Sequence, residues 1–421
     1  MASIQSRRAF LRFSALGGTG IILAACGAAQ PTTTTSGSSA AATAAPAMAA
    51  TAAMAATAAP AAAAAPATMS GMMSAAELGG MEALVKAAQA EGLLTLIAIP
   101  DDWSNYGAIK KAFTAKYGIT VNTLNPDGSS QEELEAIKAN KDNKGPQAPD
   151  TIEVGLAFGP DAKKDGLITP YKVAVWDSIP ADLKDAEGYY YGDYYGVMSM
   201  LVNTDIVKTV PTDWADLLKP EYKGQVALAG DPRGSNQAIQ TVYAAALANG
   251  GSLEDAQPGL DFFAKLNQAG NLVPVIAKQA SFAKGETPIM FTWDYLALGA
   301  RDALNGNPPV EIVLPKSALY AGMYVQAVSA YAPHPNAARL WMEYIYSDEG
   351  CNMWIEGYAR PVRFDDMNKR GVIPQDVLAK LPPPEKYTNV VFPKPEQVVA
   401  ARALITGGWD SVVKADIKAA T

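Results

Sequence analysis

Two α/β lobes joined by a two-stranded hinge are predicted by three features of this chain of 421 residues. First, apolar segments of strand length alternate with amphipathic segments of helix length from residue 93 onward, which is typical of an α/β fold. Second, residues 76–421 are too many for one hydrophobic core, because single cores usually stop growing at roughly 250–300 residues. Third, the strand pattern places crossings between lobes near Leu201 and near Pro315, and two such crossings form a hinge.

Residues 76–200 are predicted to form the first part of lobe 1. A helix is expected over residues 81–91, because Leu84, Val85 and Ala88 share one face and Gly92 follows them. Residues 93–99 are continuously apolar, as expected of a strand that helices cover on both faces. The same reasoning predicts helices over 106–117 and 130–137 and strands over 119–124 and 150–154. Strand, loop and helix in repetition indicate a mostly parallel sheet.

Residues 201–315 are predicted to form lobe 2, and residues 316–421 to return to lobe 1 and end in C-terminal helices. A long strand over 194–203 leads into lobe 2. Further strands are expected at 225–230, 273–277, 288–293 and 310–314, with helices from 212 and from 236. The return consists of a strand over 324–329 and helices around 340–346 and 351–356.

The first 25 residues predict a cleaved export signal. Arg7 and Arg8 form a twin arginine, and an apolar run over residues 16–25 precedes Cys26. This run is far shorter than the roughly 20 residues that span a bilayer, so it does not predict a transmembrane helix. The twin arginine indicates the bacterial pathway that exports folded proteins.

Leu23-Ala24-Ala25-Cys26 resembles the bacterial lipobox. This resemblance implies that Cys26 becomes the lipidated first residue of the mature protein and anchors it to the outer face of the cell membrane. An ordinary signal with an incidental Cys26 is the alternative. Both interpretations place the protein outside the cytoplasm.

Residues 26–75 are predicted to be a disordered tether. They consist almost entirely of Ala, Thr, Pro, Ser, Gly and Met, without any charged or aromatic side chain. Such a segment lacks the large side chains needed to offset the entropy of ordering it. As a flexible coil it would reach roughly 40 Å, enough to let an anchored domain move near the membrane.

The charge excludes one class of partner. The chain has a net charge of −8, which becomes −11 when residues 1–25, with three arginines and no acidic residue, are removed. An acidic surface repels nucleic acid and anionic lipid, so we expect no nucleic-acid role and membrane contact only through the lipid.

Histidine and cysteine are too scarce for a zinc or copper site, and no metal or cofactor is expected. Cys351 has no partner for an internal disulfide if Cys26 carries lipid, and it is predicted to be buried and inert. His334, the single histidine, lies between two prolines and is predicted to be a solvated loop residue.

Four motifs carry a resemblance to a family. They are Val202-Asn203-Thr204-Asp205, Trp214-Ala215-Asp216-Leu217, Lys219-Pro220-Glu221-Tyr222-Lys223-Gly224 and Gly357-Tyr358-Ala359-Arg360-Pro361-Val362. With them the chain resembles the bacterial extracellular solute-binding proteins of ABC importers, in the branch of the polyamine, ferric-iron, thiamine and phosphonate binders. The resemblance covers about residues 93–363 and implies a type II periplasmic-binding-protein-like fold. We read the motif at 214–217 as structural, a capped helix start with a buried Trp.

The resemblance to the polyamine binders also implies ligand contacts. The loop with Trp103, Ser104 and Tyr106 is similar to the one that supplies an aromatic wall and a hydroxyl, and it follows a strand at the carboxyl end, where ligands of α/β sheets sit. Asp231 matches an acidic contact of that family. The position of the family's second acidic contact is occupied by Gly234 in this chain, which departs from the pattern of the polyamine binders.

The residue types agree with a cationic ligand. Trp and Tyr faces attract alkylammonium groups and a carboxylate neutralises them. Trp103, Trp293, Asp231 and Asp294 would form such a box, with Tyr295 beside it. In the alternative interpretation the tryptophans fill the lobe cores and the aspartates cap helices.

Anionic and ferric ligands remain the alternatives. Ser129 and Ser130, and likewise Ser235, precede helices whose free N–H groups suit phosphate, and Arg233 could add a bidentate contact. For ferric iron, tyrosines gather at Tyr189, Tyr190, Tyr191, Tyr194 and Tyr195, although the iron binders carry adjacent tyrosines in lobe 2. We expect this tyrosine cluster to lie at a rim or strand edge.

The resemblance implies a monomeric protein that captures a small polar solute by lobe closure and hands it to ABC permease subunits. No nucleophile elbow, His-Glu-x-x-His sequence or Walker glycine loop is present, so no enzyme is predicted. A secreted hydrolase or cofactor enzyme is the alternative from a different class.

Overall fold

The computed structural model describes residues 73–419. The predicted signal peptide, Cys26 and nearly all of the predicted tether lie outside these residues. The strands are β1 (Leu93–Ile97), β2 (Thr120–Leu124), β3 (Thr151–Gly155), β4 (Ile168–Thr169), β5 (Tyr191–Asn203), β6 (Val226–Leu228), β7 (Ile289–Trp293), β8 (Val310–Val313), β9 (Ala321–Ser329) and β10 (Arg360–Pro361). The helices are α1 (Met81–Glu91), α2 (Tyr106–Tyr117), α3 (Ser130–Ala139), α4 (Gly159–Lys164), α5 (Asn236–Ala248), α6 (Gln257–Gln268), α7 (Gln279–Ala283), α8 (Asp294–Leu304), α9 (Pro335–Ile345), α10 (Asp348–Glu356), α11 (Phe364–Arg370), α12 (Gln375–Leu378) and α13 (Pro395–Gly408).

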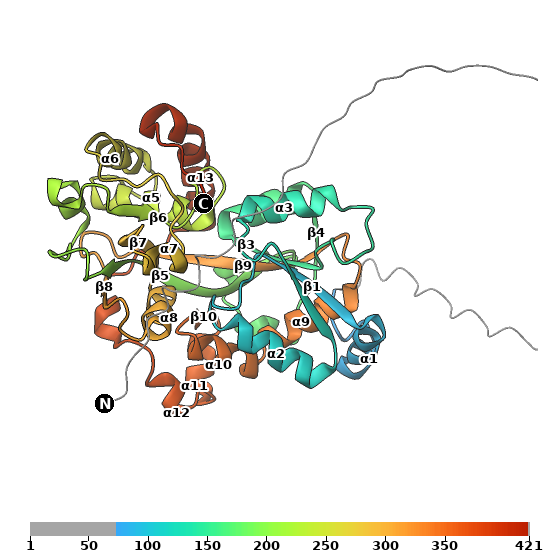
Figure 1. Ribbon diagram of the computed structural model, residues 1–421. Coiled ribbons are helices and arrows are strands. Elements are labelled where there is room, and N and C mark those ends of the chain that lie inside the picture. Colours follow the sequence, from blue (N-terminus) through green and yellow to red (C-terminus); the bar gives the residue numbers. More distant parts are fainter. Residues whose placement is uncertain (1–72, 420–421) are drawn as a thin grey trace, which may run out of the picture. The chain divides into compact units, whose positions relative to one another are not determined.

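The first lobe contains β1 to β4 with helices α1 to α4 and α9 (Figure 1). The predicted helices and strands up to residue 155 are confirmed within one to two residues at most of their ends. Ser129 caps α3, where its side chain accepts a hydrogen bond from the Glu132 N–H and the Glu132 side chain returns one to the Ser129 N–H, a complete capping box.

The prediction of a mostly parallel sheet is wrong. Only β1 with β2, and β6 with β7, pair in parallel among the described strands, whereas β3, β4, β5, β7 and β9 join through antiparallel pairs. The reason is the chain path: β9 returns from the second lobe and lies between β3 and β5, against the direction of both.

β5 connects the two lobes. Its first part, up to Val197, pairs with β9, and its second part, from Met198, pairs with β7 and β8 of the second lobe. The register shifts between Gly192 and Tyr195, which marks a bulge in the first part. Figure 1 shows β5 and β9 side by side, with β6 to β8 and α5 to α8 toward one end and β1, α1, α2 and α3 toward the other. The two lobes therefore share these strands, as a two-stranded hinge requires.

The strand predicted over residues 273–277 is absent, and the segment runs beside β6 without forming a ladder. Val273 N–H donates to Val226 and Ala277 N–H donates to Leu228, but Pro274 between them has no N–H to donate. A proline in a central strand removes a ladder hydrogen bond. By contrast, the capped start with a buried Trp at 214 is confirmed, since Asp213 accepts from Trp214 N–H and Trp214 is 1% exposed.

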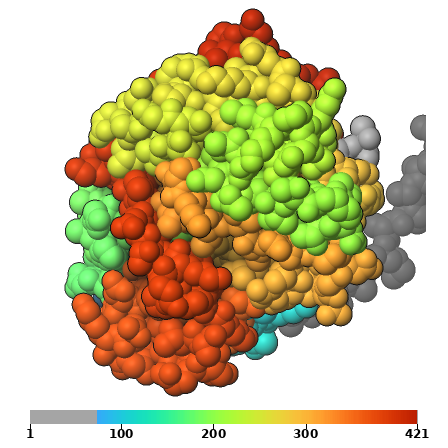
Figure 2. Space-filling model, turned by 90° about the vertical axis from the view of Figure 1, so that its left-hand side faces the viewer, coloured from blue at the N-terminus to red at the C-terminus, as the bar shows by residue number. Residues whose placement is uncertain are grey.

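The C-terminal segment contacts both lobes. Helix α13 packs on α5 and α6 of the second lobe and on the short 3-10 helix η1 (Leu156–Phe158) of the first. Arg402 of α13 donates to the Ala157 carbonyl at 3.1 Å and to Asp161 at 2.6 Å. Figure 2 shows the C-terminal residues in red beside the second-lobe residues in green and yellow. After residue 316 the chain therefore packs on the second lobe as well as returning to the first.

Two predictions about single side chains have opposite outcomes. Cys351 is fully buried, as predicted, and burial raises the pKa of its thiol to about 12. The prediction of a solvated His334 is wrong: its side chain is 15% exposed, and Nδ1 lies 2.9 Å from Oδ2 of Asp150. Asp150 also accepts from the His334 N–H, so the loop is fixed to the end of the first-lobe sheet.

The tyrosines predicted at a rim are partly in the core. Tyr191 and Tyr194 are fully buried because β5 has neighbours on both sides.

Within residues 73–419, no helix is both long and apolar enough to cross a membrane.

Candidate ligand-binding cleft

Residues of both lobes line a cleft of about 770 Å³. The first lobe contributes the loop after β1, the loop after β2 with the start of α3, and Glu153 of β3. The second lobe contributes the loop after β6 with the start of α5, and parts of α7 and α8. Since β1, β2 and β6 all end here, the cleft lies beyond the carboxyl ends of strands, where α/β sheets bind ligands.

Most of the predicted site residues line this cleft. They are Trp103, Ser104, Asp231 and Tyr295, with Ser129, Ser130, Arg233 and Ser235 among the secondary candidates. Tyr106, Trp293 and Asp294 do not line it.

Trp103 is half-buried and stands among tyrosines. Its ring lies 5.6 Å from that of Tyr324 and 6.2 Å from that of Tyr295, both in edge-to-face geometry. The loop that carries it is strained, because Ser104 and Asn105 adopt positive φ angles of 44° and 66°. Such conformations cost on the order of 1–3 kcal/mol each and concentrate where a ligand is held. Gly357 fits against this loop, since a Cβ there would lie 2.8 Å from the Ser104 carbonyl carbon.

Ser104 and Tyr295 have hydroxyl groups without a hydrogen-bond partner in the part of the chain that the structure describes. Both residues are 2% exposed, and neither Ser104 Oγ nor Tyr295 Oη makes a hydrogen bond within the described residues. A buried polar group left unsatisfied costs about 1–3 kcal/mol. A ligand in the cleft could satisfy both.

Asp231 is already paired. Nε of Arg233 lies 2.9 Å from both carboxylate oxygens of Asp231, and Nη2 lies 2.7 Å from one of them. Arg233 also reaches Asp416 at 3.0 Å, and these carboxylates raise its pKa further. The charge of Asp231 is therefore neutralised by a neighbour two residues away.

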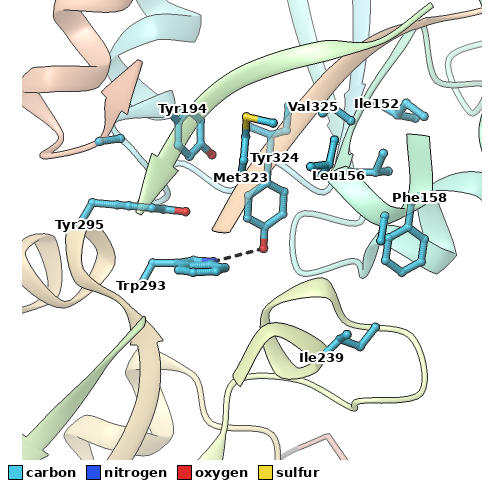
Figure 3. Packing of buried hydrophobic residues seen from close by; sticks show 14 of the residues in the cluster. Ile152, Leu156, Phe158, Tyr194, Ile239, Trp293, Tyr295, Met323, Tyr324 and Val325 are labelled. Atoms are coloured by element: carbon cyan, nitrogen blue, oxygen red, sulfur yellow. Dashed lines mark hydrogen bonds between the residues drawn. The ribbon is translucent and has the colours of Figure 1, made fainter. Parts of the chain in front are cut away.

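Trp293 and Asp294 support the junction between lobes. Trp293 is fully buried, and its Nε1 lies 3.5 Å from the Tyr324 hydroxyl (Figure 3). Its ring packs over Gly322, where a Cβ would lie 2.2 Å from the ring. Asp294 accepts hydrogen bonds from Val197 N–H at 2.8 Å and from the Tyr387 hydroxyl at 2.7 Å. These contacts account for both side chains without a ligand.

The sequence reasoning missed a cluster of buried carboxyl groups at the cleft. Glu133 of α3 and Glu153 of β3 line it, and Asp193 of β5 lies behind them. Tyr106, which was expected at the ligand, instead donates to Glu153 at 2.9 Å. Burial raises the pKa of all three carboxyl groups. A glutamate within the otherwise uncharged strand Thr-Ile-Glu-Val-Gly was the available signal.

Contacts across the cleft mean that the structure is closed. Nζ of Lys278 lies 3.0 Å from Oδ1 of Asp127, and the Gln131 N–H donates to the Gly234 carbonyl at 3.4 Å. Asp127 and Gln131 belong to the first lobe, and the other two residues to the second.

The helix starts at the cleft differ. The first turn of α3 already contains a capping box and carries two glutamates. Their negative charge disfavours a bound anion at this helix start. At α5 the N-cap Ser235 makes no side-chain hydrogen bond and the first turn has no acidic residue. Of these two helix starts, that of α5 retains the character of an anion site.

Comparison with known proteins fits this architecture. Residues 151–390 match the family model described as bacterial extracellular solute-binding protein. A Haemophilus influenzae protein of uncharacterised function is 31% identical over 264 residues, 59% of this chain and 71% of that protein. The spermidine/putrescine-binding periplasmic protein of Escherichia coli is 26% identical over 281 residues, 62% of this chain and 76% of that protein.

Solved structures agree on the fold. The periplasmic binding protein AfuA from Actinobacillus pleuropneumoniae, with exogenous fructose-6-phosphate bound, superposes with a TM-score of 0.61 at 20% identity, covering 77% of this chain and 99% of that one. Iron-bound HitA from Pseudomonas aeruginosa superposes with a TM-score of 0.56 at 16% identity, covering 75% of this chain and 99% of that one. The predicted two-lobe fold is confirmed, and these relatives are binding proteins rather than enzymes. The chain belongs to the bacterial extracellular solute-binding proteins, which work outside the cytoplasm and serve ABC importers.

Proposed function

We propose that this protein captures a small organic cation by closing its two lobes over it and delivers it to an ABC permease. The charge of the cleft wall carries this proposal. Among residues 73–419, eight acidic residues line the cleft against two basic ones, Arg233 and Lys278. Each of these two basic residues forms a salt bridge with an aspartate, Asp231 and Asp127 respectively. Such a low-dielectric, negatively charged cleft favours cations.

The aromatic wall supports the same ligand class. Trp103, Tyr295 and Tyr324 line the cleft beside the carboxyl groups. Aromatic faces attract an ammonium group by about 0.5–2 kcal/mol each, depending on desolvation. The Escherichia coli relative is named for binding spermidine and putrescine, which are organic cations.

Lobe closure is the proposed mechanism of capture. Trp103 and Ser104 on the first lobe and Tyr295 on the second form half-sites, and a ligand that touches both favours the closed state. β5 and β9 would act as the hinge. We expect the protein to act as a monomer.

Titration calorimetry tests the ligand class. The mature protein, dialysed extensively, would be titrated with putrescine, spermidine, fructose-6-phosphate and ferric citrate. Binding of an amine and of no anion supports the proposal, whereas heat from fructose-6-phosphate alone contradicts it.

A ligand with an anionic group is the second candidate, and the start of α5 favours it. The first N–H groups of α5 face the cleft without a side-chain cap. Ferric iron has less support: none of the tyrosines at 189–191, 194 and 195 lines the cleft, and within the described residues no group of three His, Cys, Asp or Glu side chains could hold a metal.

Membrane anchoring through Cys26 is a separate part of the proposal, supported by the sequence alone. Expression in a bacterium with Cys26→Ser should release the protein from the membrane fraction, whereas the unchanged protein should remain there. Equal release of both would contradict a lipid anchor.

A further inference from the structure

Glu133 and Glu153 line the cleft and Asp193 lies behind them, and none of these three carboxyl groups has a cationic partner among the described residues. Glu133, Glu153 and Asp193 are 1%, 4% and 0% exposed. They come from α3, β3 and β5, and no lysine, arginine or histidine forms a salt bridge with any of them within residues 73–419. Burying an unpaired carboxylate is strongly unfavourable.

Neutral donors hold Glu153 in place. Its Oε1 accepts hydrogen bonds from the hydroxyls of Tyr106 at 2.9 Å and Tyr194 at 2.5 Å. The Glu153 N–H in turn donates to Glu133 at 2.9 Å. These contacts orient the Glu153 carboxyl group but supply no positive charge.

The unpartnered hydroxyls are independent evidence for a ligand in this cleft. Ser104 Oγ and Tyr295 Oη lie in the same cleft, buried and without a hydrogen bond among the described residues. The ring of Tyr295 lies 5.4 Å from that of Tyr194, whose hydroxyl contacts Glu153. Figure 3 shows the Tyr324 hydroxyl directed at Trp293, with the side chains of Tyr194 and Tyr295 nearby.

We propose that Glu153 is the counter-ion of a primary ammonium group of the ligand, and that Ser104 Oγ and Tyr295 Oη accept its remaining hydrogens. This proposal rests on the proposed function and narrows it from organic cations to primary amines. A primary ammonium has three N–H donors, and these side chains offer three acceptors. A quaternary ammonium has no N–H to donate, so it would leave both hydroxyls unsatisfied.

The test compares ligands and variants. Putrescine and its N,N,N,N′,N′,N′-hexamethyl derivative would be titrated into wild-type protein, Glu153→Gln and the control Glu82→Gln, which removes an exposed carboxylate of α1 that does not line the cleft. We expect putrescine to bind at least a hundredfold more tightly than its permethylated form. Glu153→Gln should weaken putrescine binding at least a hundredfold, and Glu82→Gln less than threefold.

The melting temperature of the ligand-free protein separates a binding role from a structural one. Because Glu153 is buried without a cation, Glu153→Gln should leave the melting temperature unchanged or raise it. A lower melting temperature together with lost binding would assign Glu153 a structural role and overturn the proposal.

Two further outcomes distinguish this inference from the proposed function. Tight binding of the permethylated diamine, or unchanged putrescine binding by Glu153→Gln, overturns the inference while cation binding stands. No binding of any ammonium compound by the wild-type protein overturns both.

Discussion

The indole Nε1 of Trp103 donates a 2.5 Å hydrogen bond to the Tyr194 hydroxyl, which itself donates to Glu153 at 2.5 Å. The aromatic wall of the cleft and its buried carboxyl group are thus held by one tyrosine. Trp103 lies in the loop after β1, and Tyr194 lies in β5, the strand that joins the lobes. The hydrogen bond between them therefore ties the position of this loop to β5.

Trp103→Ala should weaken binding of putrescine at least tenfold, about 1.4 kcal/mol. The change removes an aromatic face at the cleft and the donor to Tyr194. Trp103→Phe is the matched control, because it keeps the face and removes only the donor, and it should retain part of the affinity. Calorimetry on both variants measures the difference, and an unchanged affinity of Trp103→Ala would exclude Trp103 from the site.

Trp293→Ala should act on stability instead. The ring is fully buried and packs over Gly322, so its removal leaves a cavity costing about 3–5 kcal/mol of unfolding free energy. Urea denaturation followed by circular dichroism measures this loss. A fully stable variant with weakened ligand binding would instead place Trp293 at the ligand.

Gly357→Ala should disturb the Trp103 loop from behind. The added Cβ would meet backbone atoms of Ser104 and Asn105 at 2.8–2.9 Å, and these cannot move aside like a flexible side chain. We expect a loss of about 1–3 kcal/mol in stability and weaker ligand binding. Gly407→Ala, where a Cβ meets nothing within 4 Å, is the control, and equal effects at both sites would refute the steric explanation.

The Lys278–Asp127 salt bridge should contribute little to closure. Its side chains are 45% and 73% exposed, and exposed pairs are worth about 0–1 kcal/mol. Lys278→Ala should therefore raise the dissociation constant less than fivefold, and less still in 0.5 M salt. A loss of a hundredfold would mean that Lys278 contacts the ligand directly.

His334 should make the stability of the protein depend on pH. Hydrogen bonding to Asp150 raises the pKa of His334 above its ordinary value of 6.5, with Glu91 acting in the same direction and burial opposing both. A group with a raised folded-state pKa stabilises fully below its unfolded pKa, and this stabilisation is lost as pH rises through the folded pKa.

The difference in unfolding free energy between wild type and His334→Gln isolates this contribution, because the chain has no other histidine. Urea titrations from pH 5.5 to pH 8.5 should show the difference shrinking as pH rises. A difference that grows with pH would contradict the assignment.

Local patterns predicted the helices and strands well, because capping boxes such as Ser129–Glu132 and continuous apolar runs such as that of β1 act within a few residues. Sheet direction was not accessible in this way, since β9 pairs with strands far away in the chain. The same limit applies to the site. Nothing local in Thr292-Trp293-Asp294 tells which side of β7 faces the cleft.

The Asp231–Arg233 ion pair could be predicted from the sequence, whereas the carboxyl cluster around Glu153 could not. The pairing of Asp231 with Arg233 is local, two residues apart, and the sequence does contain that signal. Glu153, however, gains its importance from Glu133, Asp193 and Tyr194, which only the folded chain brings together.

A crystal structure of the mature protein with putrescine tests the central claim most directly. The account predicts a closed cleft with the diamine in it and one of its nitrogens within hydrogen-bond distance of the Glu153 carboxylate, Ser104 Oγ and Tyr295 Oη. Diamine density elsewhere on the molecule, or an occupied cleft in which Glu153 touches no cation, would contradict it.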